Sequence, residues 1–202
     1  MVKQIITHLA ACFALAAGVA VLGNVAQAAS PDIVKTCFGC HGDKGVSENK
    51  DIPSIAGMSA FYIEGELTAY QKGERTCSKN AAGNMCEISK KLTPDEVKAA
   101  SAYFETQHFS AGEQAFDSQK AAKGKGIFQV ECEKCHSAGG SSPSDDAGIL
   151  AGQWLPYLEN TIKDFRGGKR PYADQMKPKL EALTPEQIDS LLNYFASEGA
   201  KK

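Results

Sequence analysis

Apolar residues in this chain form one long run near its start and short stretches with helical spacing afterwards. The run extends from Leu9 to Val25. It follows the basic Lys3 and precedes the small residues Ala26-Gln27-Ala28, an order typical of a secretory signal peptide cut after residue 28. Beyond it, no apolar stretch approaches the ~20 residues that span a bilayer. We therefore expect residues 1–28 to be a cleaved signal peptide and the mature chain to have no membrane span.

The remaining apolar positions follow the helical period. They recur at helical spacing from Phe61 to Tyr70 and again from Tyr157 to Phe165. No alternating run indicates an extended sheet. The predicted fold class is therefore all-α.

The chain also repeats itself. Adding 95 to the number of a residue in the first half gives its counterpart in the second half, until the four extra residues between Arg75 and Met85 reduce the shift to 91. Near its end each half contains Leu-Thr-Pro followed by an acidic residue. This motif predicts the capped start of a closing helix that ends near Phe104 or Phe195. The repeat indicates two similar domains. The corresponding pairs include Ala56 and Ala151, Tyr62 and Tyr157, Glu64 and Glu159, Tyr70 and Phe165, Arg75 and Arg170, Met85 and Met176, and Thr93 and Thr184.

One motif in each half carries chemistry. Cys37-Phe38-Gly39-Cys40-His41 returns as Cys132-Glu133-Lys134-Cys135-His136. Two cysteines three apart followed by histidine form the attachment site of c-type haem, in which the thiols bond the vinyl groups and the histidine binds iron. A single copy could be half of a redox or zinc site, but a repeated copy favours haem. We expect two covalently bound haem c groups, with a helix carrying or leading into each motif.

Composition narrows the class of protein further. Removal of residues 1–28 leaves 174 residues with 21 basic and 24 acidic side chains, a formal charge of −3. This mild acidity argues against nucleic acid or an anionic membrane as the partner. Two haems in a chain of this length favour two small domains, at residues 29–107 and 108–202, the second including a linker between roughly 107 and 122. The signal peptide and the haem motifs together predict the periplasm.

An electron-transfer haem commonly takes methionine as its second axial ligand. The mature chain contains Met58, Met85 and Met176, of which the last two correspond in the repeat. We therefore predict that Met85 binds the iron opposite His41, and that Met176 binds it opposite His136. The alternatives are Met58, or His108 near the linker, or methionines that only fill space around the haem.

Cys77 and Cys86 occur only in the first half and flank its four extra residues. In an oxidising compartment they are predicted to form a disulfide that fixes the loop carrying Met85. The alternative is that Cys86 binds iron as a thiolate and makes the first haem a catalytic site.

Other paired residues have two interpretations each. Arg75 and Arg170 could neutralise haem propionates or be solvated charges at helix ends. Trp154 and Tyr157 could pack on the second haem or at the domain interface, or be ordinary core aromatics.

With these residues assigned, the chain resembles the dihaem cytochrome subunit of flavocytochrome c sulfide dehydrogenase and, more distantly, the cytochrome c-four family of electron carriers. The resemblance covers most of the mature chain and is closest in the second half, in Gln114-Ala115-Phe116-Asp117, Ile149-Leu150-Ala151-Gly152-Gln153-Trp154 and Asp164-Phe165-Arg166. It implies two tandem class I cytochrome c-like domains related by a pseudo-twofold axis, each wrapped around one covalent haem with His/Met ligation. The Cys77/Cys86 loop departs from the pattern of that subunit.

The resemblance implies an electron-transfer subunit without enzymatic activity of its own. Its expected partners are a flavoprotein sulfide dehydrogenase subunit, in a heterodimer, and a soluble or membrane-bound electron acceptor. No Gly-x-Gly-x-x-Gly element indicates that this chain binds flavin itself. Two other functions stay open, namely a free dihaem carrier of the c-four type and an enzyme that oxidises sulfur compounds at a Cys-ligated haem.

Overall fold

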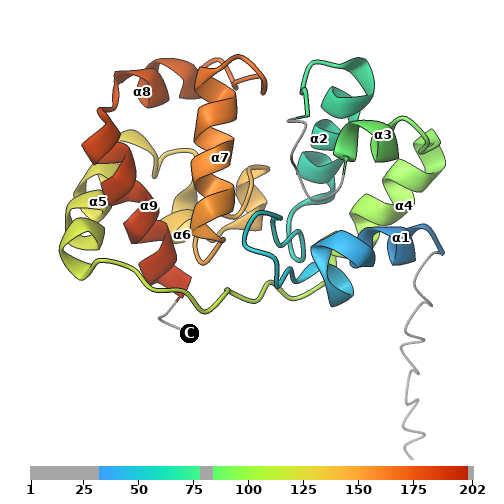
Figure 1. The fold of residues 1–202 in the computed structure, drawn as a ribbon, viewed down its shortest axis with the longest axis horizontal. Coiled ribbons are helices and arrows are strands. Elements are labelled where there is room, and N and C mark those ends of the chain that lie inside the picture. Colours follow the sequence, from blue (N-terminus) through green and yellow to red (C-terminus); the bar gives the residue numbers. More distant parts are fainter. Residues whose placement is uncertain (1–31, 78–83, 200–202) are drawn as a thin grey trace, which may run out of the picture.

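The computed structural model describes residues 32–77 and 84–199, and within these ranges no residue belongs to a strand. The signal peptide predicted at residues 1–28 lies outside the described residues. None of the helices in the described part is long and apolar enough to cross a bilayer. In chain order (Figure 1), the elements are α1 (Asp32–His41), η1 (Asp43–Gly45), α2 (Ala60–Lys72), α3 (Met85–Ser89), α4 (Pro94–Glu105), α5 (Ser118–Glu131), α6 (Ser137–Gly140), η2 (Pro143–Asp145), α7 (Leu155–Arg166), α8 (Met176–Ala182) and α9 (Pro185–Gly199).

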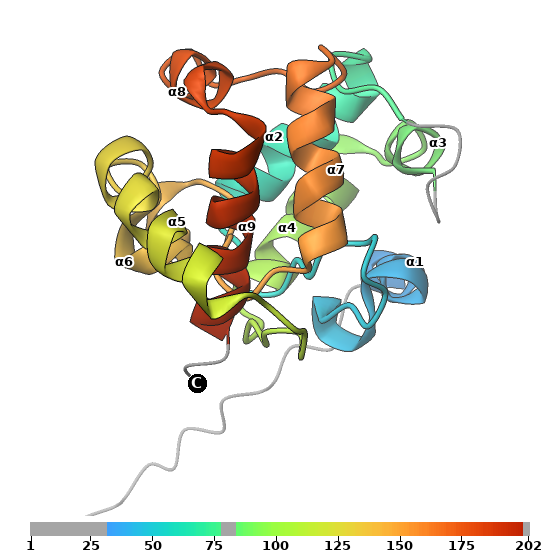
Figure 2. The same ribbon diagram turned by 60° about the vertical axis from the view of Figure 1, so that its left-hand side comes forward.

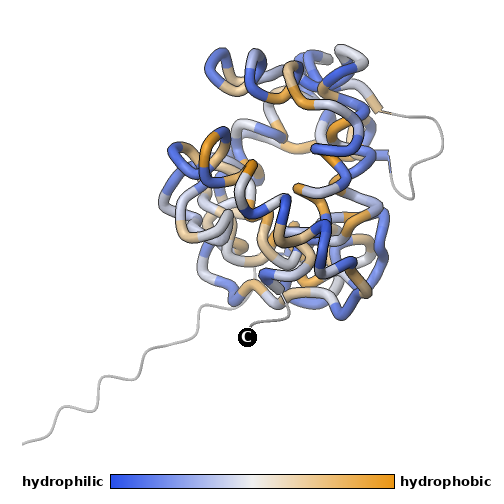
Figure 3. The backbone as a smooth tube through the Cα atoms, turned by 90° about the vertical axis from the view of Figure 1, so that its left-hand side faces the viewer, coloured by the Kyte–Doolittle hydropathy of each residue, from blue (hydrophilic) through white to orange (hydrophobic). Residues whose placement is uncertain are grey.

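The helices form two domains, α1–α4 and α5–α9, which lie side by side in Figure 1. Helix α9 lies between α5 and α7 in both Figure 1 and Figure 2. Apolar and polar segments alternate along the helices (Figure 3), as amphipathic helices require. Each domain has its own apolar core, the first around Val34, Leu67 and Phe104, the second around Phe128 and Leu158. The predicted all-α, two-domain fold is confirmed.

The closing helices begin as their sequences predict. Thr93 caps α4 by accepting a hydrogen bond at Oγ1 from the backbone N–H of Glu96, 3.3 Å away, while Glu96 accepts one from the backbone N–H of Thr93 at 2.8 Å. Thr184 and Gln187 make the same reciprocal pair at α9. Helix α4 ends at Glu105, close to the predicted end, whereas α9 continues four residues beyond Phe195 to Gly199.

The sequence repeat is also a repeat of backbone hydrogen bonds. The Gly57 N–H donates to the Phe104 carbonyl at 2.8 Å, and the counterpart Gly152 N–H donates to the Phe195 carbonyl at the same distance. Both glycines have a positive φ, 71° and 76°, a conformation that other residues rarely adopt. Each bond ties the turn before α2 or α7 to the closing helix of its own domain.

The linker is shorter than its sequence predicts. The connection between the domains runs from 106 to 117 without a helix, and α5 already begins at Ser118, so the predicted linker end at residue 122 is wrong. The physical reason is a cap: the Asp117 carboxylate accepts from the backbone N–H groups of Gln119 and Lys120 at 2.8 and 3.0 Å. The predicted domain boundary between residues 107 and 108 falls within this connection and stays a prediction.

The domains are joined by hydrogen bonds between buried groups. Gln153 of the second domain donates from Nε2 to the Ser54 carbonyl and accepts at Oε1 from the Ser54 N–H, both at 2.9 Å. The Trp154 indole N–H donates to the Ser47 carbonyl at 2.8 Å. Trp154 therefore lies at the domain interface, which was one of its three expected places.

Candidate haem sites

The first motif is carried by α1. Its histidine, His41, is buried, and its Nδ1 lies 2.8 Å from the Pro53 carbonyl oxygen. A carbonyl only accepts, so Nδ1 must carry the proton and Nε2 keeps its lone pair free for a metal. Burial lowers the pKa of His41, although the bond to Pro53 acts in the opposite direction. A neutral imidazole with a fixed tautomer suits an iron ligand.

A cavity of about 540 Å³ adjoins this motif. Cys37, Cys40 and His41 line it together with apolar side chains such as Leu67 and Phe104. Its volume lies within the ~300–1,000 Å³ range of cofactor pockets. The residues present fit a haem, held by two thiols and an imidazole against an apolar wall. Bound there, haem supplies one-electron exchange at its iron.

Two methionines line this cavity. Met85 begins α3, and Met58 is buried in the first core. The fold thus brings both candidate ligands to one cavity, and the repeat, in which Met58 has Gln153 as its counterpart, favours Met85. His108 is exposed in the linker and is not among the residues that line the cavity.

Cys77 and Cys86 are joined by a disulfide, with their Cα atoms 6.0 Å apart. The bond closes the loop immediately before α3 and places a covalent link next to Met85. A sulfur bonded to another sulfur is not a thiolate, so in this structure Cys86 is unsuited to iron ligation.

The second motif follows α5, which ends at Glu131, directly before Cys132. Cys132 and Met176 are both partly buried and pack against the same apolar core of the second domain. Burial lowers the pKa of His136, while the nearby Asp145 acts to raise it. The fold thus brings Cys132 of the motif and the predicted ligand Met176 to one core.

The cysteines themselves argue against a redox motif. Burial raises the pKa of Cys37, and it raises the pKa of Cys132 to about 11. A thiol used in disulfide exchange needs a lowered pKa instead. The first cysteine of each motif therefore does not have the lowered pKa of a thiol used in disulfide exchange.

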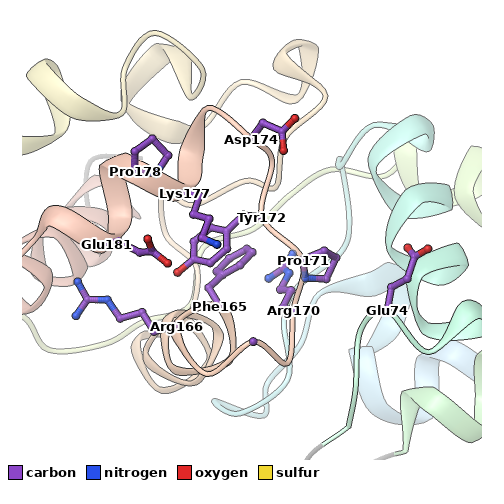
Figure 4. A pocket seen from close by; sticks show the side chains of 11 residues that line it. Glu74, Phe165, Arg166, Arg170, Pro171, Tyr172, Asp174, Lys177, Pro178 and Glu181 are labelled. Carbon is purple, nitrogen blue, oxygen red and sulfur yellow. The ribbon is translucent and has the colours of Figure 1, made fainter.

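A further cavity, of about 660 Å³, lies beside α8. Figure 4 shows Phe165, Tyr172 and Lys177 in it, with Arg170 and Pro171 toward the first domain. Its lining includes no residue of either Cys-x-x-Cys-His motif. We therefore do not assign it to haem.

The second domain contributes to the first site. Tyr157, Asn160 and Thr161 of α7 line the cavity that contains Cys37 and His41. The first haem site is therefore completed by the other domain. Tyr157 also packs against the apolar core of its own domain, so it lies where that core meets the first cavity.

Arg170 is buried and the Arg75 side chain is only 11% exposed, so their interpretation as solvated charges is wrong. Both guanidinium groups contact the Glu66 carboxylate, and Arg170 Nη2 lies 2.5 Å from Glu66 Oε1. We call Glu66, Arg75 and Arg170 the ionic cluster. Burial acts to raise the pKa of Glu66, but the charges of Arg170 and Arg75 outweigh it and lower that pKa.

Sequence analysis missed Glu66 and Pro53. Glu66 corresponds to Thr161 and Pro53 to Gly148, so the repeat gave no signal for either. Their roles depend on contacts with Arg170 and with His41 that only the folded chain shows. No pattern in the sequence alone therefore predicts the roles of these two residues.

A helical domain that carries Cys-x-x-Cys-His and positions its histidine beside a cofactor-sized cavity defines a c-type cytochrome. The family model for cytochrome c oxidase, cbb3-type, subunit III matches residues 119–195. Cytochrome c-554(548) of Halomonas halodenitrificans is 31% identical over 80 residues, which cover 40% of this chain and 94% of that protein. Cytochrome c4 of Pseudomonas aeruginosa is 28% identical over 144 residues, covering 66% of this chain and 68% of the relative.

Two further comparisons concern the fold and the electron donors of relatives. The structure of Acidithiobacillus ferrooxidans cytochrome c4 matches with a TM-score of 0.67 and 25% identity, over 81% of this chain and 99% of that chain. A protein named thiosulfate dehydrogenase electron acceptor, from Stutzerimonas stutzeri, is 34% identical over 71 residues, 35% of this chain and 32% of that protein. This chain belongs to the same family of c-type cytochromes as cytochrome c-554(548), and it is similar to cytochrome c4 in sequence and in fold. It is a dihaem electron-transfer cytochrome with two covalent haem c groups.

Proposed function

We propose that this chain is a periplasmic carrier that accepts electrons from a dehydrogenase of an inorganic sulfur compound and passes them to a soluble or membrane-bound acceptor. The observation that carries the proposal is the shared first site, in which α7 of the second domain lines the first cavity. Two haem domains that complete one another form a single conducting unit, so electrons can enter at one face and leave at another.

Four side chains bind iron in this proposal. His41 and Met85 are the axial ligands of the first haem, and His136 and Met176 are those of the second. The cysteines Cys37, Cys40, Cys132 and Cys135 hold the two haems covalently. Met85→Ala and Met176→Ala should each remove about half of the methionine-to-iron absorption band of the oxidised protein. Met58→Ala is the matched control and should leave the band unchanged.

Two donors are candidates. The resemblance of the second half to the cytochrome subunit of flavocytochrome c sulfide dehydrogenase supports a flavoprotein sulfide dehydrogenase, bound as a heterodimer. The relative named thiosulfate dehydrogenase electron acceptor supports a thiosulfate dehydrogenase. In either case the dehydrogenase performs the chemistry on sulfur and this chain takes up the electrons. The disulfide at Cys86 favours this role over catalysis at a thiolate-ligated haem.

The nature of the complex follows from charge. A formal charge of −3 on the predicted mature chain gives little long-range attraction. A lasting complex with the donor would have to rest on apolar contact, burying on the order of 1,600 Å² in total. A free carrier would instead meet its donor only briefly.

The test is stopped-flow reduction of the oxidised protein, isolated from the periplasmic fraction. Sulfide with a flavoprotein sulfide dehydrogenase, and thiosulfate with a thiosulfate dehydrogenase, are mixed with it in separate experiments. We expect one of the two pairs to reduce both haems much faster than the sulfur compound alone. If neither dehydrogenase accelerates reduction, the proposed donor class is wrong. Co-purification with the effective donor would distinguish a bound subunit from a free carrier.

A further inference from the structure

The ionic cluster joins the two domains through one second-domain side chain. Arg170 has only 6% of its side chain exposed. Its Nη2 donates to the Tyr62 hydroxyl at 2.7 Å and to Glu66 Oε1 at 2.5 Å, both in the first domain. Arg75, in the first domain, binds the other oxygen of the same carboxylate. The second domain thus places a positive charge inside the surroundings of the first.

The correspondence between the two halves is broken at this point. Arg75 lies over the Tyr70 ring at 4.5 Å from its centroid, and its counterpart Arg170 lies over the Phe165 ring at 4.6 Å. The two arginines therefore correspond in sequence and in their contact with an aromatic ring. Glu66, however, corresponds to Thr161, so that the repeat supplies two guanidinium groups for one carboxylate.

This arrangement leaves an uncompensated positive charge. The three residues of the ionic cluster sum to +1, and the buried Nε of Arg170 has no hydrogen-bond partner. Buried charges and buried donors are normally paired, because leaving either without a partner costs free energy. Burial acts to raise the pKa of Tyr157, but the charges of Arg170 and Arg75 outweigh it and lower that pKa. The cluster is thus built for an additional anionic group.

The location of the cluster indicates which group is affected. Glu66, Arg75 and Tyr62 line the cavity that contains Cys37, Cys40 and His41. Haem brings two carboxylate groups of its own, which a guanidinium fork binds well. Arg170 reaches the residues of this cavity from the other domain, next to Pro171 in Figure 4.

We propose that Arg170 is a cross-domain positioning residue that raises the reduction potential of the first-domain haem. Reduction adds one electron to the ferric iron, with no bond made or broken. A fixed positive charge nearby stabilises that added electron, and the low-dielectric surroundings strengthen the effect. Through the same contacts, Arg170 fixes the Tyr62–Glu66 face against the second domain. The inference extends the proposed electron transfer but does not depend on which dehydrogenase is the donor.

The test is a mediated redox titration of the intact dihaem protein, followed by paramagnetic NMR. The signals of the first haem are assigned through their contacts with Leu67 and Ile88, which line the first cavity. In Arg170→Gln, we expect the ratio of ferric to ferrous first haem at a fixed potential to rise about tenfold, equivalent to about 59 mV for a one-electron couple. In Glu66→Gln, which removes the negative charge, the potential should shift in the opposite direction.

Two variants serve as controls. Arg166→Gln removes the same charge from the same domain, but Arg166 donates to the Leu180 and Leu183 carbonyls within its own domain. It should leave the first haem unchanged. Arg170→Lys keeps the charge and should stay near the wild-type potential. If Arg170→Gln does not fold, the opposite shift in Glu66→Gln still tests the cluster.

The outcomes separate the alternatives. A downward shift of the first haem in Arg170→Gln but not in Arg166→Gln supports the proposal. An equal shift in both would indicate a general charge effect and overturn it. A shift of the second haem alone would show that Arg170 acts within its own domain, and it would also overturn the proposal. Because mediators replace the donor, failure here leaves the stopped-flow test of the donor unaffected.

Discussion

Replacing Gln153 by alanine would remove the most buried hydrogen-bonded link between the domains. The Gln153 side chain is 1% exposed and makes a reciprocal pair with the backbone N–H and carbonyl of Ser54 at 2.9 Å each. Ser54 is itself 2% exposed, so both backbone groups would lose their partner in a place that solvent does not reach.

The structure sets the magnitude. A buried polar group left without a partner costs about 1–3 kcal/mol. Two such groups, partly relieved by water entering the space left by the amide, give a loss of about 2–4 kcal/mol in the free energy of unfolding. The first domain should also lose part of its stabilisation by the second. We therefore expect the two domains of Gln153→Ala to unfold in separate steps.

Guanidinium denaturation of the haem-loaded protein, followed by Soret absorbance and by Trp154 fluorescence, measures both effects. Trp154 reports on the interface because its indole donates to Ser47 across it. Gln129→Ala is the matched control, since Gln129 is exposed on α5, and it should change stability by less than about 0.5 kcal/mol. A change in Gln153→Ala as small as that of the control would refute the reasoning.

Three more expectations follow from particular residues. A Cβ at Gly124 would lie 2.0 Å from the Ser190 carbonyl oxygen, so Gly124→Ala should lower the free energy of unfolding by about 1–3 kcal/mol or more by disturbing the α5–α9 contact. In the control Gly126→Ala, whose Cβ meets nothing within 4 Å, thermal unfolding should occur at an equal or higher temperature. The pKa of Glu66 is lowered in the fold from its ordinary value of 4.5, so its contribution to stability is present above that pH and is lost as the pH falls below it. Urea denaturation at a series of acidic pH values should show wild type losing its advantage over Glu66→Gln, and a difference that stays constant would contradict this. Removing the disulfide in the double variant Cys77→Ser/Cys86→Ser should lower the free energy of unfolding by about 2–3 kcal/mol, and the methionine-to-iron band should disappear at a lower temperature than in wild type. If the band disappears at the wild-type temperature, the disulfide does not hold Met85.

Local signals account for what the sequence predicted well. The cap at Thr93 and the apolar spacing of Phe61–Tyr70 act within one or two turns, and the structure has α4 and α2 there. The repeat extended these predictions to the second domain. The haem motifs could also be recognised from the sequence, because covalent attachment requires a fixed spacing of two cysteines and a histidine.

Contacts between distant segments account for what the sequence did not predict. The polar start of α5 resembled a linker, but the cap by Asp117 starts the helix at Ser118. For Arg75 and Arg170 the sequence left two interpretations equal, and their burial on Glu66 decides against the solvated one. No sequence pattern indicated an interdomain role for Gln153, although it forms the link to Ser54. Such long-range pairings leave no periodic pattern in the chain.

The most direct test of the account is the intact mass of the mature protein under denaturing, non-reducing conditions. The account predicts a polypeptide that begins at Ala29, carries two haem additions that survive denaturation, and lacks the two hydrogens lost when Cys77 and Cys86 join. The Cys132→Ser/Cys135→Ser variant should retain one haem. A wild-type mass with one haem or none would contradict the dihaem account itself.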